Sequence, residues 1–180
     1  GSYRLDWGST AAADNNRIET YGLSGSFVFN TLVDQDWLSF GKLRVNYAEA
    51  PIFPGTYATS PTYGSSTAYG SLAALNVPNT LANPNLTGGM RTELEYGVEM
   101  KFMKNRLGLD FTYFDREDSN LPVSITAAGG TGYTGLSVNS KITSTAGVEA
   151  MISGTPILTD DIRWDVSFNF GRFKKAVDFI

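Results

Sequence analysis

The chain has 180 residues and a formal net charge of −4, and it contains neither cysteine nor histidine. Without these residues it can form no disulfide or thiolate metal site, and it lacks the commonest general base and metal ligand. The acidic balance argues against nucleic acid as the main partner, because such a partner needs an excess of Lys and Arg.

Three segments near the N-terminus alternate apolar with polar side chains: residues 3–7, 21–30 and 37–49. Alternation predicts strands, because successive side chains of a strand point to opposite faces. The small, polar residues 9–17 indicate a loop, and a short connection around residues 33–36 joins the second and third segments. No stretch approaches the roughly 18 apolar residues of a transmembrane helix.

Residues 51–89 break the alternation, since they are rich in Pro, Gly, Ser and Thr and include Tyr57, Tyr63 and Tyr69. We expect a loop here, far longer than the usual connection, and loops of this length are normally functional or disordered. Alternation then returns in residues 93–102.

A tight turn at residues 103–106 leads into another alternating segment, residues 107–113. Residues 119–141 are again rich in Gly and Ser, so we expect a second long loop. A further alternating segment occupies residues 148–155. A turn at residues 158–161 precedes the last strand.

That last segment, residues 162–174, alternates strictly over nine or more residues. A strand of a soluble protein usually has about 5–6 residues, whereas a membrane-spanning strand needs about 9–11. One face is apolar and the other polar: Ile162, Trp164, Val166, Phe168 and Phe170 against Arg163, Asp165, Ser167 and Asn169.

The seven predicted strands are joined alternately by long and short connections. In an up-and-down antiparallel sheet, all short connections then lie at one end and all long ones at the other. This asymmetry is typical of bacterial outer-membrane barrels. We therefore predict an all-β fold: residues 1–180 form a segment of an antiparallel transmembrane β-barrel, with residues 50–89 as a long extracellular loop. Seven strands leave open edges, which hydrocarbon does not tolerate, so the barrel must be larger than this segment.

The alternative is a soluble, secreted, carbohydrate-binding β-sandwich, which also alternates apolar and polar residues. Sandwich strands are shorter, and their outward faces usually carry more charge than the Gly, Ser and Asn found here. The two folds make opposite predictions for the apolar face. It is buried between two sheets in a sandwich and exposed to lipid in a barrel.

Five short motifs follow one another along residues 83–170 of the chain. They are N-P-N-L at residues 83–86, E-Y-G-V-E at 95–99, N-R-L-G-L-D at 105–110 with Y-F-D at 113–115, G-V-E at 147–149 with S-G-T-P-I at 153–157, and W-D-V-S-F-N-F at 164–170. In order and spacing they resemble passages of the SusC/RagA family of TonB-linked outer-membrane proteins, and residues 37–44 are similar to the strand before that family's long loop. Departures occur at residues 87–90, where the family has K-P-E, and at Thr145-Ala146, where it has Asn-Lys.

This resemblance implies an integral outer-membrane importer with a barrel of about 22 strands, plugged from inside. The present residues would belong to the C-terminal half of the barrel. The plug, the TonB-contacting segment and the signal peptide would lie elsewhere. A SusD-like surface lipoprotein would cover the barrel as a lid, and the substrates would be oligosaccharides or oligopeptides.

In a barrel, the polar faces would look into the lumen and the apolar faces toward outer-membrane lipid. The lumen-facing candidates are Glu93, Glu95, Glu99, Arg163, Asp165 and Asn169, and the lipid-facing candidates are Ile162, Trp164, Val166, Phe168 and Phe170. The loop residues Tyr57, Tyr63 and Tyr69 are candidates for substrate binding, because aromatic faces and hydroxyls suit sugar rings or peptide backbones. Packing of the loop against itself or against a lid is the alternative.

We predict no catalytic residue, metal or cofactor, and no enzymatic activity. Carboxylates are paired in sequence at Asp34/Asp36, Glu117/Asp118 and Asp160/Asp161, where a solvated turn is the simplest interpretation for two of the pairs. Residues 115–120 offer oxygen ligands for Ca²⁺, but they lack the spacing and the Gly of an EF-hand loop. A glycosidase remains a third, weaker alternative.

Overall fold

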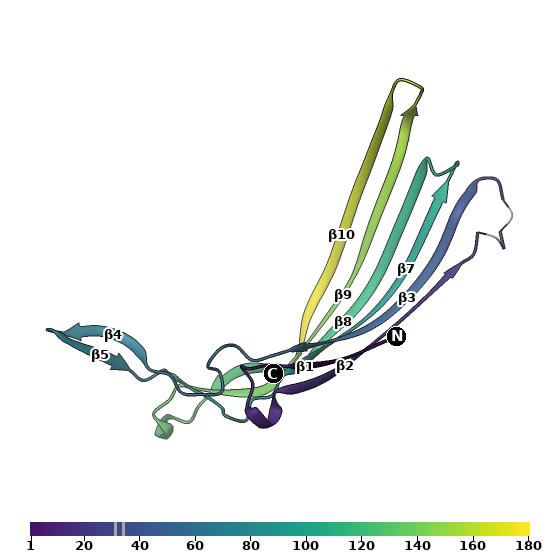
Figure 1. Cartoon of the computed structure of the whole chain (residues 1–180). Coiled ribbons are helices and arrows are strands. Elements are labelled where there is room, and N and C mark those ends of the chain that lie inside the picture. Colours follow the sequence, from purple (N-terminus) through teal and green to yellow (C-terminus); the bar gives the residue numbers. More distant parts are fainter. Residues whose placement is uncertain (31, 34) are drawn as a thin grey trace.

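The computed structural model describes residues 1–30, 32–33 and 35–180, and so leaves out Thr31 and Asp34. Its main feature is one antiparallel sheet, in which seven long strands neighbour each other in chain order (Figure 1). The predicted all-β, up-and-down arrangement is confirmed. The strands are β1 (Ser2–Trp7), β2 (Arg17–Val28), β3 (Leu38–Ile52), β7 (Gly89–Phe102), β8 (Leu107–Thr126), β9 (Gly135–Leu158) and β10 (Arg163–Phe179).

Helical structure in the described chain is limited to two turns of three residues each, η1 (Ala13–Asn15) and η2 (Gly129–Thr131). None of the described residues lies in a helix with the length and apolarity needed to cross a membrane.

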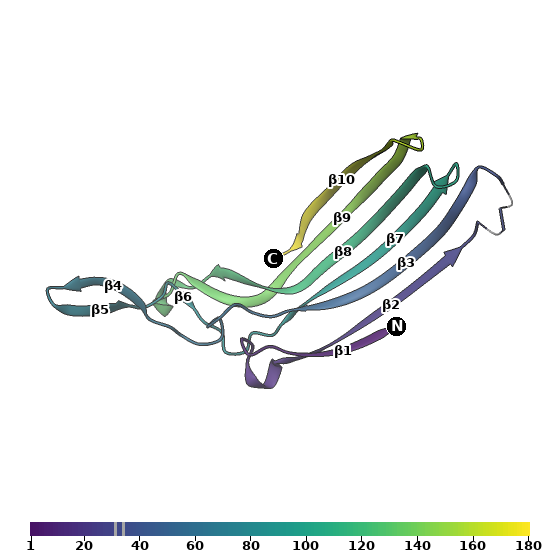
Figure 2. The same cartoon turned by 45° about the horizontal axis from the view of Figure 1, so that its top comes forward.

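The connections alternate between the two ends of the sheet, as predicted (Figures 1 and 2). Their lengths do not all sort as predicted, because residues 127–134 between β8 and β9 are no more numerous than residues 29–37 between β2 and β3. Between β7 and β8, Met103, Lys104 and Asn105 reverse the chain with φ angles of 53°, 57° and 66°. Between β9 and β10, the Thr159 amide donates a hydrogen bond to the Ile162 carbonyl at 2.9 Å. The short connection between β2 and β3 includes Asp34, which lies outside the described residues.

The second long loop, expected at residues 119–141, is for the most part not a loop. β8 continues to Thr126 and β9 begins at Gly135, and the two strands stay paired as far as Thr126 and Gly135. The pairing shifts register around Leu121 and Pro122, where proline has no amide to donate. The extension does alternate, with Leu121, Val123 and Ile125 on one side of β8, but the Gly and Ser residues around it favoured a loop.

Residues 51–89 are also more ordered than predicted. Strands β4 (Gly64–Tyr69) and β5 (Leu72–Asn76) form a hairpin that projects away from the sheet (Figure 1). We call residues 63–77, which comprise this hairpin and its immediate flanks, the arm. After it, β6 (Thr80–Leu81) pairs in parallel with β9 at Gly135 and Leu136, beyond the end of β10.

Three asparagines fasten the N-P-N-L passage to the β8–β9 hairpin. The Asn139 carboxamide accepts a hydrogen bond from the Thr87 amide at 2.9 Å and donates one to the Thr87 carbonyl at 3.0 Å. Asn120 donates to Thr87 Oγ1 at 2.7 Å, and Asn83 donates to the Ser137 carbonyl at 3.0 Å. Leu86 is 0% exposed and is thus enclosed by this attachment. The long loop therefore has a fixed base.

The described chain has no conventional hydrophobic core. Only Leu38 and Leu86 are buried apolar residues, and in the described part of the chain no second sheet packs on either face of the main sheet. A β-sandwich buries its apolar faces between two packed sheets. The sandwich alternative is therefore wrong for this fold.

The asparagine network leads to a first prediction. Asn139→Ala removes both hydrogen bonds to the Thr87 backbone. Leaving the partly buried amide and carbonyl of Thr87 without partners costs about 1–3 kcal/mol. We expect hydrogen exchange at residues 79–88 of the full-length protein to become about tenfold faster or more, with exchange in β7 unchanged. Asn169→Ala is the matched control, because the described structure gives the Asn169 side chain no hydrogen bond. Equal exchange in the two variants would contradict the role of the network.

Candidate functional site

One face of the sheet is a continuous apolar surface. Register places Phe27, Leu43, Val98 and Phe111 in a single row across β2, β3, β7 and β8. Phe111 is 39% exposed although it lies on an interior strand, so nothing in the described chain covers it. An exposed apolar surface of this extent indicates a partner that is itself apolar.

The five candidates for lipid contact all lie exposed. Val166, Phe168 and Phe170 pair with Gly154, Ile152 and Ala150 and so continue the apolar face across β9. A register shift separates Trp164 from Val166, and Ile162 lies in the turn before β10. Because β10 is an edge strand here, the interior strands are the stronger evidence for exposure of this face.

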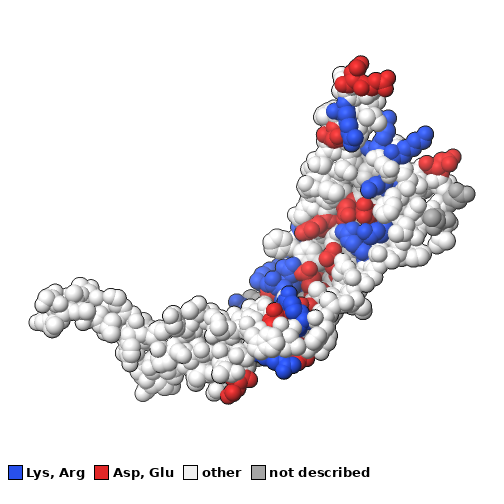
Figure 3. All heavy atoms as spheres, in the orientation of Figure 1, with Lys and Arg blue, Asp and Glu red and all other residues white. Residues whose placement is uncertain are grey.

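The opposite face carries the charged residues, which run as a lane along the strands (Figure 3). The three glutamates of β7 are all ion-paired on this face. Glu93 pairs with Arg116, Glu95 lies 3.8 Å from Arg44 Nε, and Glu99 lies 3.6 Å from Lys42 Nζ. Each of these glutamates thus has a basic partner on a neighbouring strand of the same face.

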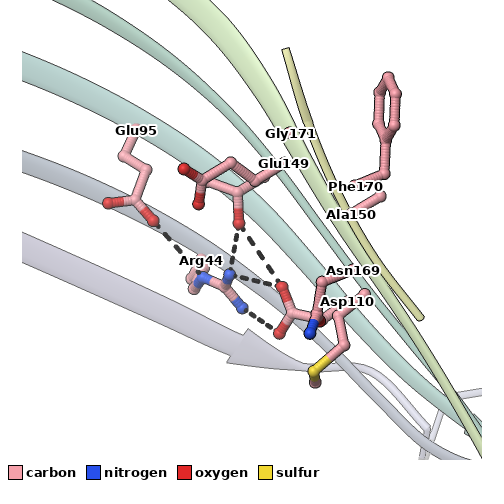
Figure 4. A pocket seen from close by; sticks show the side chains of 10 residues that line it. Arg44, Glu95, Asp110, Glu149, Ala150, Asn169, Phe170 and Gly171 are labelled. Atoms are coloured by element: carbon pink, nitrogen blue, oxygen red, sulfur yellow. Dashed lines mark hydrogen bonds and ion pairs between the residues drawn. The ribbon is translucent and has the colours of Figure 1, made fainter. Parts of the chain in front are cut away.

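Arg44 is the centre of the lane. From β3 it reaches two strands away and binds both carboxylate oxygens of Asp110 on β8, at 3.0 and 2.8 Å (Figure 4). It also donates to Thr112 Oγ1 at 2.6 Å. A bidentate Arg–carboxylate contact is geometrically specific and among the stronger polar interactions. We call Arg44, Glu95, Asp110 and Thr112 the Arg44 cluster.

Gly97 makes this reach possible. It lies on β7 between Arg44 and Thr112 in register, directly beneath the arginine side chain. A β-carbon at position 97 would overlap Arg44 Nε and lie 2.6 Å from Arg44 Cγ. The glycine of the E-Y-G-V-E motif therefore provides the space in which the guanidinium crosses β7.

Gly147, in the G-V-E motif, has the same function for an aromatic ring. Phe114 on β8 lies over it, and a β-carbon there would be 2.6 Å from the ring and 2.8 Å from the β-carbon of Phe173. Both motif glycines thus accept a side chain from a neighbouring strand. Sequence reasoning recorded the motifs but did not identify this role.

A hollow of 520 Å³ opens on the polar face beside the Arg44 cluster. Its lining extends from Arg44 on β3 to Asn169 on β10 (Figure 4). Glu95, Asp110 and Glu149 contribute three carboxylates against one guanidinium, which makes the hollow acidic. Phe170 points away from the other labelled side chains (Figure 4).

The other lumen candidates lie on the same face but outside this cluster. Arg163 pairs with Asp165 at 2.8 Å, and Asp165 also accepts a hydrogen bond from Thr155 at 2.6 Å. Both are exposed near the short turns, whereas Asn169 lines the hollow. The structure therefore brings only Asn169 and Glu95 to the hollow and leaves the remaining candidates along the lane.

A second bidentate Arg–carboxylate pair lies toward the long loops. Arg91 binds both oxygens of Asp118 at 2.6 and 2.9 Å, and the Asp118 side chain is 7% exposed. These hydrogen bonds lower the pKa of the Asp118 carboxyl below its usual range. The pair therefore favours the folded state at neutral pH, and this contribution is lost as acidification protonates Asp118.

The three loop tyrosines do not form one site. Tyr63 precedes β4 and Tyr69 ends it, so six positions of extended chain, about 20 Å, separate them. All three are exposed, so the idea that they pack the loop against itself finds no support. A single sugar-ring platform built from all of them is likewise not supported.

The three acidic pairs of the sequence lie in different structural settings. Among the described residues, no group of three or more His, Cys, Asp or Glu could hold a metal ion. Glu117 and Asp118 are neighbours in a strand, on opposite faces of β8, rather than residues of a turn or loop. Asp160 and Asp161 lie exposed in a turn, as expected, and Asp34 lies outside the described residues.

The apolar face ends at a defined level. Along β8, Leu107, Leu109, Phe111 and Tyr113 give way to Asp115 on the same face. On β10 the change comes after Phe170, where Arg172 follows. Tyr96 is directly opposite Tyr113 at this level, whereas Trp37 stacks on Phe102 at the short-turn end. Aromatic residues thus border the apolar band at both ends.

No protein-family model and no curated protein matches the chain. Solved structures do. Two structures of the RagAB peptide importer, one of them in the closed-closed state, match with TM-scores of 0.82 and 0.83 and a sequence identity of 19%. Each alignment covers 99% of this chain and 20% of the RagAB chain. The siderophore receptor PirA from Pseudomonas aeruginosa matches with a TM-score of 0.61 and 20% identity, over 93% of this chain and 30% of its own.

The chain thus spans about 20% of the RagAB chains that it matches, almost from end to end of its own length. At these identities the comparison establishes the fold alone, which is that of the matched section of these structures. The structural part of the resemblance to SusC/RagA proteins is confirmed.

The Arg44 cluster yields a second prediction. In full-length protein, Gly97→Ala should displace Arg44 from Asp110 and lower the free energy of unfolding by about 1–3 kcal/mol, the cost of a broken charged hydrogen bond. The control is Gly154→Ala on β9, where a β-carbon would lie 3.6 Å from the nearest atom.

A double-mutant cycle isolates the cause. In an Arg44→Ala background, Gly97→Ala should cost little, because nothing then crosses β7. Urea unfolding midpoints of the purified protein provide the measurement. An equal loss with and without Arg44 would show that Gly97 has some other role.

Proposed function

We propose that this chain is a section of the barrel wall of a SusC/RagA-type, TonB-dependent importer in the outer membrane of a Gram-negative bacterium. The observation that carries the proposal is a single sheet whose apolar face is uncovered and whose other face is hydrated and charge-paired. In water such a sheet would aggregate; in a bilayer the apolar face meets lipid and the polar face lines an aqueous lumen.

The dimensions support this placement. From Phe102 to Leu94, two residues beyond Tyr96, apolar side chains alternate with polar ones along β7 over eight steps, about 27 Å along the strand. Strands of such barrels are tilted, and their apolar band is about 25 Å tall with aromatic girdles at both interfaces. With Trp37 and Phe102 at one border and Tyr96 and Tyr113 at the other, the short turns are periplasmic and the long loops extracellular.

The exposed edges of β1 and β10 support a larger barrel. Their outer backbone groups have no partner in the described chain. Hydrocarbon does not tolerate unpaired peptide groups, so each edge continues into a further strand of the same barrel. By resemblance, the plug and the TonB-contacting segment belong to other parts of the full-length protein.

In this proposal the protein moves an oligopeptide or oligosaccharide inward beneath a SusD-like surface lipoprotein, driven through TonB. The name of the RagAB structures, a peptide importer, favours the peptide. This section performs no covalent chemistry. Its contribution is the wall, the acidic hollow and the loops above it.

Orientation of the two faces gives a third prediction, tested on adjacent residues of β10. Phe168→Arg places a charge against lipid and should cost about 2–4 kcal/mol of folding free energy near the bilayer centre. Ser167→Arg, on the other face, should be nearly neutral because it meets lumen water. The measurement is refolding of the full-length barrel into lipid vesicles over a urea series. Equal costs would overturn the assignment of the faces.

The class of the protein is tested by a fourth prediction. Full-length protein should fractionate with the outer membrane, require detergent for extraction and support growth on an oligopeptide or oligosaccharide in a TonB-dependent manner. Peptide mixtures and glycan mixtures supplied separately distinguish the substrates. Full-length protein that is monomeric and soluble without detergent would refute the proposal.

A further inference from the structure

The arm, residues 63–77, is the least supported part of the described chain. β4 and β5 pair with each other and with no other described strand, and the hairpin projects beyond the sheet (Figures 1 and 2). An isolated two-stranded hairpin is at best marginally stable in water. An arm of this kind is stabilised when another surface covers it.

The tip of the arm presents an apolar and aromatic pair. Tyr69 and Leu72 are paired across the turn and are 85% and 68% exposed. Gly70 makes the turn with a φ of 61°. Leu75 and Val77 add further exposed apolar side chains nearer the base. Tyrosine inserted into a pocket is a typical anchor of a protein interface.

Charge is absent from the whole segment. Between Glu49 and Arg91 there is no Asp, Glu, Lys or Arg, and the arm carries none of the coloured atoms in Figure 3. Such a surface fits a partner surface that is also uncharged, because a buried charge without a counter-charge is costly. It also offers no carboxylate to bind sugar hydroxyls, which disfavours a glycan as the occupant.

The position of the arm excludes lipid tails. The chain leaves the apolar band at Tyr47, passes Glu49 on the same face and continues to Ile52 before the loop begins. The arm therefore lies outside the bilayer. The chain that follows the arm is attached to the β8–β9 hairpin by the bonds of Thr87 with Asn120 and Asn139, so the arm projects from an attached segment.

We infer that the tip of the arm, Tyr69 with Leu72, is an anchor for the lid: it inserts into an uncharged, apolar pocket on the SusD-like lipoprotein. This inference rests on the proposed function, since it names the element through which the proposed partner is held. Tyr69 then differs in role from Tyr57 and Tyr63, because it contacts the lipoprotein rather than the substrate.

The test uses the full-length transporter, co-expressed in the outer membrane with the SusD-like lipoprotein encoded beside it. A photoreactive phenylalanine analogue at position 69 should crosslink to the lipoprotein. The same analogue at position 158, where Leu158 is exposed at the opposite end of the sheet, should not. Tyr69→Ser combined with Leu72→Ser should weaken lipoprotein binding at least tenfold, whereas Leu158→Ser should leave it unchanged.

Barrel assembly in the outer membrane, scored separately, shows that each variant folds. A crosslink from position 69 to the transported peptide or glycan, or unchanged binding by the double variant, would overturn the inference and leave the importer intact. If the unmodified transporter retained no lipoprotein, the lid would be removed from the proposed function and the inference would fall with it.

Discussion

Backbone pairing is the constraint on which the rest of this structure depends. The main sheet has almost no buried apolar side chains, so the antiparallel ladders carry the fold. In a soluble protein this would be a weakness, because sheets are normally stabilised by a packed core. A bilayer changes the balance, since an unpaired peptide group in hydrocarbon is expensive and a paired sheet is the favourable state.

The polar face shows how side chains reinforce the ladders. Arg44 and Phe114 each lie across a neighbouring strand, above Gly97 and Gly147 respectively. The Arg44 side chain thereby links β3 to β8. The ring of Phe114 covers the backbone at Gly147, which would otherwise be exposed. Glycine usually weakens a strand, but here it admits an interaction that spans three strands. The motif glycines are thus best explained by what lies above them.

The two long strands β8 and β9 connect the wall to its loops. Beyond the level of Tyr113 they continue as a paired hairpin that reaches Thr126 and Gly135, with Val123 opposite Val138 and Ile125 opposite Leu136. This extension provides the surface on which Asn139 and Asn120 hold the long loop. The loop thereby combines a rigid base with a projecting arm. Its two halves differ in role although they are alike in composition.

The sequence by itself determined the strands that cross the apolar band, the face of each that is apolar and the parity of the connections. These follow from local alternation, because a strand displays its pattern residue by residue. Candidate residues such as Glu95 and Phe168 were placed on their faces by the same rule. Only the tertiary structure decided the length of β8 and β9, the arm, the asparagine network and the hollow beside Arg44. Each of these depends on register between strands far apart in the chain, or on the pairing of segments whose Gly and Ser content resembles a loop, so no local pattern records it.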